Sequence, residues 1–474
     1  MIWEEYKKLL PQYPAEDLKS VEACFELAQI AGDLTHPVKV SLGAAEIGLD
    51  SKAVITALLH DAVEKNLIEI KTIRKKFGEE AASLVNALAK VSAISLQGGE
   101  KTVESARKMF LAIAQDIRVV IIKLLDQLHN MQTLASLPLE TQKRLSFETL
   151  EIYSPIAERL GMGEVKAKLE DLAFKYAYPE EFSWIQKEAK EKMPRREKYL
   201  EGVIPIIRKE LEKEGIKIID IHWRTKHLYS LWKKLERYDM DWNLINDLVA
   251  IRILVESIEN CYATLGILHK LWKPLTGRIK DYIALPKKNG YQSLHTTVFC
   301  VNNVITEFQI RTPQIHENSE TGIASHWAWE MAGKPVQGPK LQSSKFNWVK
   351  QLREWHKAFD KDVSSDKSFL ESLKIDFFKD RVFAMTPKGD VVDLPEGATP
   401  IDFAYQIHSE IGSHMAGAKV NGRIAPFNHQ LASGDIVEII IQKNKKPNSE
   451  WLLSAKTSLA RSHIRSYLNK YKLI

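Results

Sequence analysis

The sequence predicts a multidomain protein in which an all-α block is followed by an α+β domain and a small β-rich module. At 474 residues the chain is too long for one ordinary hydrophobic core. From residue 1 to about 190, apolar residues recur every three to four positions, which predicts helices. From about 215 to 330 helical patterns alternate with runs rich in β-branched residues, and from 379 to 442 short runs are separated by tight-turn signals.

Composition is typical of a soluble globular protein, with 45% hydrophobic and 27% charged residues. The first residues are acidic where a signal peptide needs a basic region, and no apolar run reaches membrane-spanning length. We therefore expect a cytoplasmic protein. Cys24, Cys261 and Cys300 are far apart and lack CxxC spacing. This pattern predicts reduced, buried thiols rather than a disulfide framework or a zinc cluster.

Positive charge is concentrated at the C-terminus. The formal net charge is +6, and from Lys443 onward eight Lys and Arg residues accompany a single acidic residue, Glu450. This balance is compatible with nucleotide or RNA partners but does not require them.

Two helices of the first block can be placed from their ends. Gly48 ends one predicted helix, and Asp50 or Ser51 caps the next, which runs through AVITALLHDAVEKN. The segment AQDIRVVIIKLLDQLHNMQTL predicts a long, strongly apolar helix. These helices carry the first candidate site.

Ionisable residues interrupt this apolar pattern. His60, Asp61 and Glu64 lie in one helix and are expected to be buried together, and buried charge without a partner is costly. A metal ion is a natural partner for such a group. His36 precedes Pro37, which suits the first turn of a helix, so the His36 imidazole is expected at a helix end facing the bundle.

A polar stripe on the long helix completes the candidate metal site. Asp126, Asn130 and Thr133 follow one another at i, i+4 and i+7. Two imidazoles with two carboxylates suit Mn²⁺, Fe²⁺ or Zn²⁺. In the alternative interpretation His36 is a helix cap, His60 a hydrogen-bonded core histidine and Asp126 a surface residue.

In the mixed domain, the segment VITEFQIRT predicts a strand with one polar face. Glu307, Gln309 and Arg311 alternate with residues expected to pack inward. Asp247 opens another predicted strand. Carboxylates that converge from neighbouring strands are suited to Mg²⁺ binding and to activating a hydroxyl group for phosphoryl transfer. An ordinary sheet with a solvated face is the alternative.

Two basic segments accompany these strands: GRIKDYIALPKKNGYQSLHTT lies between them in Gly-interrupted loops, and RTKHLYSLWKKLER lies upstream on a predicted short helix. Cations can neutralise phosphate oxygens, and an aromatic ring can stack on a purine. A solvated basic face is the alternative for the second segment. The residues concerned are Arg278, Lys280, Tyr282, Lys287, Lys288 and Tyr291 in the first segment and Arg224, Lys226, Lys233, Lys234 and Arg237 in the second.

These patterns divide the chain into five parts. We predict a helical domain over 1–190, a mixed domain over 191–345, a linker helix over 346–378, a β-rich domain over 379–442 and a basic tail over 443–474. The clearest turn signals of the β-rich domain are Pro387-Lys388-Gly389-Asp390 and Asn421-Gly422.

Several segments, taken in order, resemble the RelA/SpoT homologue family of alarmone synthetase-hydrolases, from about residue 20 to residue 474. The resemblance implies an HD-type helical domain, a nucleotidyltransferase-like α+β synthetase domain and a β-grasp TGS domain. The segments are HPVKV, ALLHDAVE, KLLDQLHNMQTL, RTKHLYSLWKKL, INDLVAIRI, GRIKDYIALPKKNGYQSLHTTV, TEFQIRT and RVFAMTPKGDVVDLPEGATPIDFAYQIHSEIG.

In the helical domain, the resemblance implies a hydrolase that removes pyrophosphate from (p)ppGpp with Mn²⁺. Glu64 would activate water, and Asn130 would contact the substrate. The implied Mn²⁺ ligands are His36, His60, Asp61 and Asp126.

In the mixed domain, the resemblance implies transfer of pyrophosphate from ATP to the 3′-hydroxyl of GDP or GTP. Asp247 would hold Mg²⁺, Glu307 would deprotonate the hydroxyl, and Tyr291 would stack on the acceptor guanine. The remaining implied binding residues are Arg224, Lys226, Ser230, Lys234 and Arg252 on the ATP side and Lys280, His295 and Gln309 near the acceptor.

In the β-rich domain, the resemblance implies that His408 lies near a tRNA acceptor end. The basic tail after Lys443 favours a tRNA or ribosome partner, and a plain β-grasp scaffold is the alternative.

Departures from the family pattern keep other functions open. Lys65 follows Glu64 where the family has an acidic residue, Gln127 replaces an arginine, and the loop before His36 is altered. We expect the C-terminal modules that usually follow the TGS region in the family to be missing here. The alternatives are a synthetase with a decayed, regulatory HD domain and a non-catalytic tRNA- or ribosome-binding regulator. The Arg-x-Lys-Asp segment at 278–281 resembles members with both activities.

Overall fold

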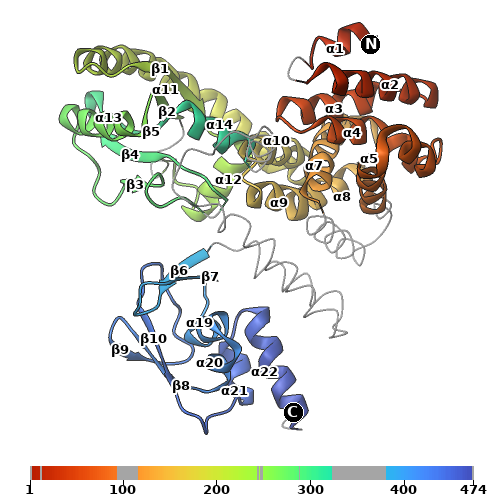
Figure 1. Cartoon of the computed structure of the whole chain (residues 1–474). Coiled ribbons are helices and arrows are strands. Elements are labelled where there is room, and N and C mark those ends of the chain that lie inside the picture. Colours follow the sequence, from red (N-terminus) through yellow and green to blue (C-terminus); the bar gives the residue numbers. More distant parts are fainter. Residues whose placement is uncertain are drawn as a thin grey trace. The chain divides into compact units, whose positions relative to one another are not determined.

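The computed structural model describes residues 3–10, 13–92, 116–242, 245, 249–287, 289–322 and 381–471. Within these ranges the chain forms two compact units, one before residue 323 and one after residue 380 (Figure 1). The first unit holds the helical block and the mixed domain, coloured red to green. No described helix is both long and apolar enough to cross a membrane.

The first part of the chain is helical throughout its described residues, as predicted. Asp50 caps α4 by accepting a hydrogen bond from the Ala53 backbone N–H, and Gly48, at a φ of 80°, follows the end of α3. The elements are α1 (Trp3–Lys7), α2 (Ala15–Ala31), α3 (Thr35–Glu46), α4 (Ser51–Glu64), α5 (Ile70–Ser92), α7 (Ile117–Gln132), η1 (Leu134–Ser136), α8 (Leu139–Glu148), η2 (Thr149–Tyr153), α9 (Ser154–Arg159), α10 (Gly163–Ala177) and α11 (Pro179–Lys213).

Helix α11 crosses the predicted domain boundary at residue 190 and continues into the core of the mixed domain. Its C-terminal half carries Leu200, Val203 and Ile207, which are buried with the apolar residues of the sheet. One long amphipathic helix therefore belongs to both the helical block and the mixed domain.

The mixed domain is built on a five-stranded sheet in the order β1-β2-β5-β4-β3. Strands β2 and β5 run parallel, and the other neighbouring pairs are antiparallel. The elements are β1 (Ile218–Thr225), α12 (Leu228–Arg237), β2 (Val249–Val255), α13 (Ile258–Leu271), β3 (Lys280–Asp281), β4 (Leu294–Phe299), η4 (Val301–Asn303), β5 (Ile305–Arg311) and α14 (Pro313–Thr321).

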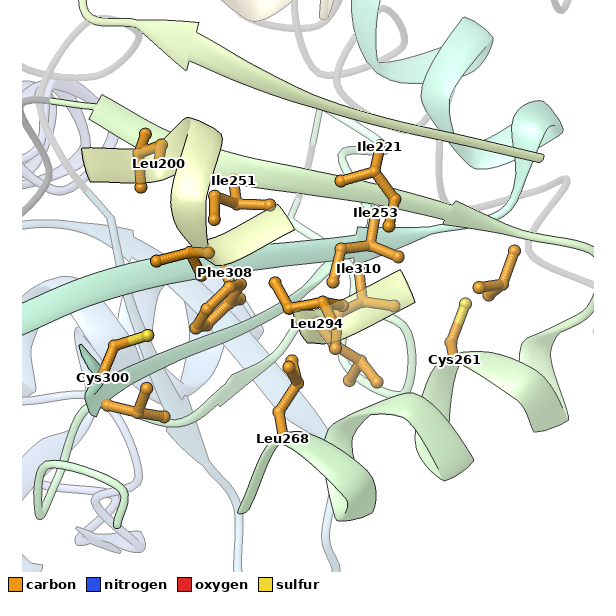
Figure 2. Close-up of a cluster of buried hydrophobic side chains, with 14 of the residues drawn as sticks. Leu200, Ile221, Ile251, Ile253, Cys261, Leu268, Leu294, Cys300, Phe308 and Ile310 are labelled. Atoms are coloured by element: carbon orange, nitrogen blue, oxygen red, sulfur yellow. The ribbon is translucent and has the colours of Figure 1, made fainter. Parts of the chain in front are cut away.

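One face of this sheet forms an apolar core. Ile251 and Ile253 of β2 lie beside Phe308 and Ile310 of β5, and all four are fully buried (Figure 2). The strand periodicity therefore sends the polar residues of β2 and β5 to the opposite face, as predicted for VITEFQIRT.

The prediction that Arg224 and Lys226 lie on a helix was wrong. Strand β1 extends to Thr225, and α12 begins only at Leu228, so Arg224 ends a strand and Lys226 lies in the turn. Pairing of Arg224 with Ala250 in β2 holds this segment in the sheet, although its basic residues are compatible with a helix.

The second unit is a small β-grasp-like domain, in which α19 packs against strands of two short sheets. Asn421 and Gly422 adopt φ values of 52° and 79° in the predicted turn between β8 and β9. The elements are β6 (Arg381–Met385), β7 (Val391–Pro395), α19 (Pro400–Ile407), α20 (Ser409–Ser413), β8 (Met415–Val420), β9 (Arg423–Ala425), β10 (Val437–Ile441), α21 (Ser449–Ser454) and α22 (Ser458–Lys470).

The segment expected to be a basic tail folds into α21 and α22. Trp451, Ile464 and Leu468 are buried against Tyr405 and Met415 of the β-grasp core. Apolar residues at helical spacing decide this outcome, because they bury surface while the basic side chains remain toward solvent. The predicted linker helix over 346–378 lies outside the described residues.

Candidate functional site

Three helices of the first block bring together a compact group of side chains of metal-ligating types. His36 comes from α3, His60 from α4 and Asp126 from α7, and one donor atom of each lies within 4.8 Å of the others. His36 Nε2 is 3.0 Å from Asp126 Oδ1 and 3.3 Å from His60 Nε2. His60 and Asp126 are almost fully buried. Two imidazole nitrogens and a carboxylate oxygen suit a divalent transition metal.

Hydrogen bonds to neighbouring residues orient the metal-ligating atoms of His60 and Asp126. His60 Nδ1 donates to the Ala57 carbonyl at 2.7 Å, which leaves the Nε2 lone pair directed at the cluster. Asp126 accepts from Lys123 Nζ at 2.5 Å and from Asn130 Nδ2 at 2.8 Å. Burial opposes ionisation of Asp126, but Lys123, His36 and His60 together outweigh it, so the pKa of Asp126 lies well below its usual range.

Asp61 and Glu64 do not share the burial expected from the sequence. Asp61 Oδ1 lies 3.3 Å from His60 Nε2, but the Asp61 side chain is 22% exposed and its Oδ2 accepts from Lys65 Nζ at 3.0 Å. Glu64 is exposed because α4 ends at this residue. The expectation that these two acids are buried together with His60 was therefore wrong.

His129 is a member of this cluster that the sequence did not indicate. Its Nδ1 lies 2.7 Å from His36 Nδ1, and burial together with His36 lowers the pKa of His129. The sequence did carry a sign of this, since His129 follows Asp126 by three residues on the same helix.

Gln127, which stands where the family has an arginine, is buried. Its side chain donates to Thr149 Oγ1 at 2.8 Å, so it has a structural role among the described residues.

In the mixed domain, four predicted binding residues fall in one row across the sheet. The register pairs Arg252 with Gln309, Gln309 with His295, and His295 with Lys280. Residues paired in this way lie on the same face of a sheet. The pairing extends to His222 of β1, opposite Arg252, so the row crosses the whole sheet.

Glu307 lies in the neighbouring row of the sheet, at the end of a series of hydrogen bonds in which each residue donates to the next. His295 Nδ1 lies 3.2 Å from Glu307 Oε1, and His295 Nε2 lies 2.8 Å from the Tyr291 hydroxyl. Burial lowers the pKa of His295, which favours the neutral ring. The neutral ring can accept from Tyr291 and donate to Glu307. Gln309 Nε2 also donates to Glu307 Oε1, at 3.1 Å.

Arg311 begins this series, and the sequence predicted only its strand face. Its Nη2 donates to the Tyr291 hydroxyl at 2.6 Å, and its Cζ lies 5.0 Å from the centroid of the Tyr291 ring. Nε donates to Ser293 Oγ at 3.2 Å. The Arg311 side chain is only 1% exposed, so a buried guanidinium orients the ring of Tyr291.

The remaining predicted residues lie on several elements. Ser230 and Lys234 lie on α12, and Arg252 Nη1 forms an ion pair with Glu320 of α14 at 3.1 Å. Asp247 and Lys288 lie outside the described residues, so the convergence of Asp247 with Glu307 stays a prediction.

In the second unit, His408 caps α20. Its Nδ1 accepts from the Glu410 backbone N–H at 3.2 Å, and the residue is exposed. The ring therefore lies at the surface of the β-grasp-like domain.

Comparison with known families finds three matching regions along the chain. A model described as a region found in RelA / SpoT proteins matches residues 223–334. A model of the HD domain matches 29–163, and a model of the TGS domain matches 382–441. The metal cluster falls in the HD match, and the polar sheet face falls in the RelA / SpoT match.

Full-length relatives match nearly the whole chain. A guanosine-3′,5′-bis(diphosphate) 3′-pyrophosphohydrolase of Aquifex aeolicus is 43% identical over 98% of this chain and 67% of its own length. A GTP pyrophosphokinase of Myxococcus xanthus is 43% identical over 92% of this chain and 57% of its own length. The bifunctional (p)ppGpp synthase/hydrolase SpoT of Escherichia coli is 37% identical over 99% and 68%. The chain thus spans between about half and two thirds of the length of these relatives.

Proposed function

Because the chain belongs to the RelA/SpoT family, we propose that it synthesises (p)ppGpp by transferring pyrophosphate from ATP to GDP or GTP. The observation that carries the proposal is the polar sheet face. Glu307 there accepts hydrogen bonds from His295 and Gln309, next to a row that contains Arg252 and Lys280. A carboxylate flanked by phosphate-binding cations is the arrangement that hydroxyl activation and phosphoryl transfer need.

In the proposed reaction, the 3′-oxygen of the acceptor forms a bond to the β-phosphorus of ATP. The bond from that phosphorus to the bridging oxygen of the α-phosphate breaks, and AMP leaves. Glu307 takes the proton of the 3′-hydroxyl, while Tyr291, oriented by Arg311, stacks on the guanine. Arg252 and Lys280 offset phosphate charge. Mg²⁺, with Asp247 as its proposed ligand, would supply further charge neutralisation when bound.

The synthetase is tested by measuring AMP formed from ATP and GDP with Mg²⁺. Replacing Glu307 by Gln should lower the rate by about 10²-fold to 10⁴-fold, since general-base catalysis is lost. Glu317→Gln, an exposed acid on α14, serves as the matched control and should leave the rate unchanged. The proposal fails if the unmutated chain forms no AMP, which would favour a non-catalytic regulator.

For the helical block, we propose hydrolysis of (p)ppGpp to GDP or GTP and pyrophosphate with Mn²⁺. His36, His60 and Asp126 would hold the ion, with Asp61 as a further ligand. The donor set fits, because each imidazole directs Nε2 toward Asp126 Oδ1. The ion would supply the Lewis acidity that activates water, Glu64 would take the proton of that water, and Asn130 would contact the substrate.

The hydrolase is tested with His60→Ala, which should abolish pyrophosphate release and weaken Mn²⁺ binding measured by calorimetry. His429→Ala in the second unit is the control and should change neither quantity. Full pyrophosphate release by the His60→Ala protein would contradict the proposed metal site.

One observation favours a second candidate, in which the HD domain is regulatory and no longer hydrolyses its ligand. Lys65 Nζ lies 3.0 Å from Asp61 Oδ2 and so competes with a metal ion for that carboxylate. If prolonged incubation with ppGpp and Mn²⁺ releases no pyrophosphate from a chain that still forms AMP, this second candidate is correct.

For the second unit, we propose a tRNA or ribosome contact through His408 and the basic residues from Lys443 onward. The exposure of His408 and the eight Lys and Arg residues from Lys443 onward support this proposal. Binding of deacylated tRNA that weakens with added salt and with His408→Ala would be the expected result.

A further inference from the structure

Helix α12 begins without a capping side chain of its own. Its N-cap position is His227, whose side chain accepts no hydrogen bond from the first turn of α12. The first N–H groups of a helix need acceptors from outside the helix, and an uncapped start leaves the helix direction poorly determined. Ser230 and Lys234, both proposed ATP-side residues, lie on this helix four positions apart and therefore on one face.

The missing acceptor is Asp171 of α10, a residue outside both the HD match and the RelA / SpoT match. Asp171 Oδ1 accepts from the Tyr229 backbone N–H at 3.0 Å, and Asp171 Oδ2 lies 2.8 Å from His227 Nδ1. One carboxylate from a distant part of the sequence thus holds both the N-cap residue of α12 and an N–H group of its first turn.

Neighbouring residues of α10 complete the contact with α12. Glu170 Oε2 accepts from Ser230 Oγ at 3.4 Å, and the Phe174 ring stacks on Trp232 with centroids 5.1 Å apart. Phe174 and Trp232 are buried, whereas the Asp171 and His227 side chains are 29% and 31% exposed. Apolar burial therefore supplies most of the adhesion between α10 and α12. The half-exposed Asp171 contributes mainly direction and register.

We propose that Asp171 is a positioning residue for the ATP side of the synthetase, acting through the first turn of α12. This inference rests on the proposed synthesis of (p)ppGpp. Without Asp171, α12 remains packed on Phe174 but its first turn frays, and Ser230 and Lys234 lose their common orientation toward ATP. The acceptor side, built on β4 and β5, does not depend on this contact.

Steady-state synthesis of AMP by the full chain, with ATP and GDP varied separately, tests the proposal. Asp171→Ala should raise KM for ATP about fivefold, the effect of losing one helix cap, and leave KM for GDP unchanged. Asp171→Asn keeps an acceptor for the Tyr229 N–H. On a logarithmic scale, its KM for ATP should therefore rise no more than half as much as that of Asp171→Ala. Glu164→Ala, which removes an exposed acid at the start of the same helix, should have no effect.

Several outcomes would overturn the proposal. They are an unchanged KM for ATP in Asp171→Ala, a parallel rise in KM for ATP and GDP, and an Asp171→Asn protein as impaired as Asp171→Ala. If Asp171→Ala does not fold, the Asp171→Asn protein is used instead, and the proposal requires its ratio of KM for ATP to KM for GDP to exceed that of the unmutated chain. If the unmutated chain forms no AMP, the synthetase itself is refuted, and binding of a non-hydrolysable ATP analogue to the same variants then tests Asp171 independently.

Discussion

At the scale of single residues, Arg311 connects the buried part of the sheet to Tyr291 of the proposed synthetase site. It is buried, and it donates to Tyr291 and Ser293. Arg311→Met should raise KM for GDP about tenfold, because charged hydrogen bonds to Tyr291 are lost. Arg311→Lys should be intermediate. AMP assays with varied GDP measure the effect, and Arg208→Met, at an exposed position of α11, is the control.

Lys65 is the residue that most directly modifies the proposed metal site. Its ion pair engages one carboxylate oxygen of Asp61, which a metal ion would otherwise compete for. Lys65→Asp should raise the apparent Mn²⁺ affinity and the rate of ppGpp hydrolysis on the order of tenfold, the usual size of effects just outside a metal's ligands. Lys75→Asp, an exposed lysine on α5, tests for a general charge effect. Equal hydrolysis rates for Lys65→Asp and the unmutated chain would contradict this prediction.

At the scale of elements, two glycines allow the turn after α9 to meet the end of α14. A Cβ on Gly322 would lie 2.3 Å from the Leu160 carbonyl oxygen, and one on Gly161 would lie 2.7 Å from the Asn289 carbonyl oxygen. The same junction is joined by a hydrogen bond from Asn289 Nδ2 to the Glu158 carbonyl at 3.1 Å. The close approach therefore connects the helical block to the loop that carries Tyr291.

Gly322→Ala should destabilise this junction by about 2 to 4 kcal/mol, because backbone atoms on both sides must move. Gly215→Ala has a similar positive φ but open space around its Cβ, so it should cost only about 1 kcal/mol. Thermal unfolding of both variants separates the steric clash from the backbone strain. Equal losses of stability in the two variants would mean that the clash is relieved at no cost.

In the second unit, Asp402 joins the start of α19 to the segment before α22. It accepts from Thr399 at the start of α19 and from the backbone N–H groups of Lys456 and Thr457 before α22. Asp402→Ala leaves these donors, of which Thr399 and Thr457 are buried, without their acceptor and should destabilise α22 by about 2 to 4 kcal/mol. Faster hydrogen exchange in residues 458–470 measures the loss. Glu450→Ala, an exposed acid of α21, should leave that exchange unchanged.

At the scale of the whole molecule, two opposed reactions are proposed for one chain with different metal ions. Removing divalent cations with EDTA should stop both synthesis and hydrolysis. Adding Mg²⁺ alone should restore AMP formation, and adding Mn²⁺ should restore pyrophosphate release, because imidazole ligands prefer transition metals to Mg²⁺. Parallel assays of both products test this, and restoration of hydrolysis by Mg²⁺ alone would contradict the proposed ligand set.

The sequence by itself determined the order of the helical, mixed and β-rich parts and much of the candidate site. Helix spacing, the Asp50 cap, the Asn421-Gly422 turn and the alternation around Phe308 are local properties, so the sequence predicted them correctly. His36, His60 and Asp126 were grouped because His60 and Asp126 interrupt apolar helices and His36 stands at a helix end facing the bundle.

Only the tertiary structure decided which side chains meet and how deeply each is buried. Glu64 is exposed where its helix ends, Arg311 is buried although it lies on the polar strand face, and Asp171 caps a helix more than fifty residues away. The row from Lys280 to Arg252 follows the strand order rather than the chain order. Such contacts depend on how sheets and helices pack against each other, and local sequence carries no record of distant partners.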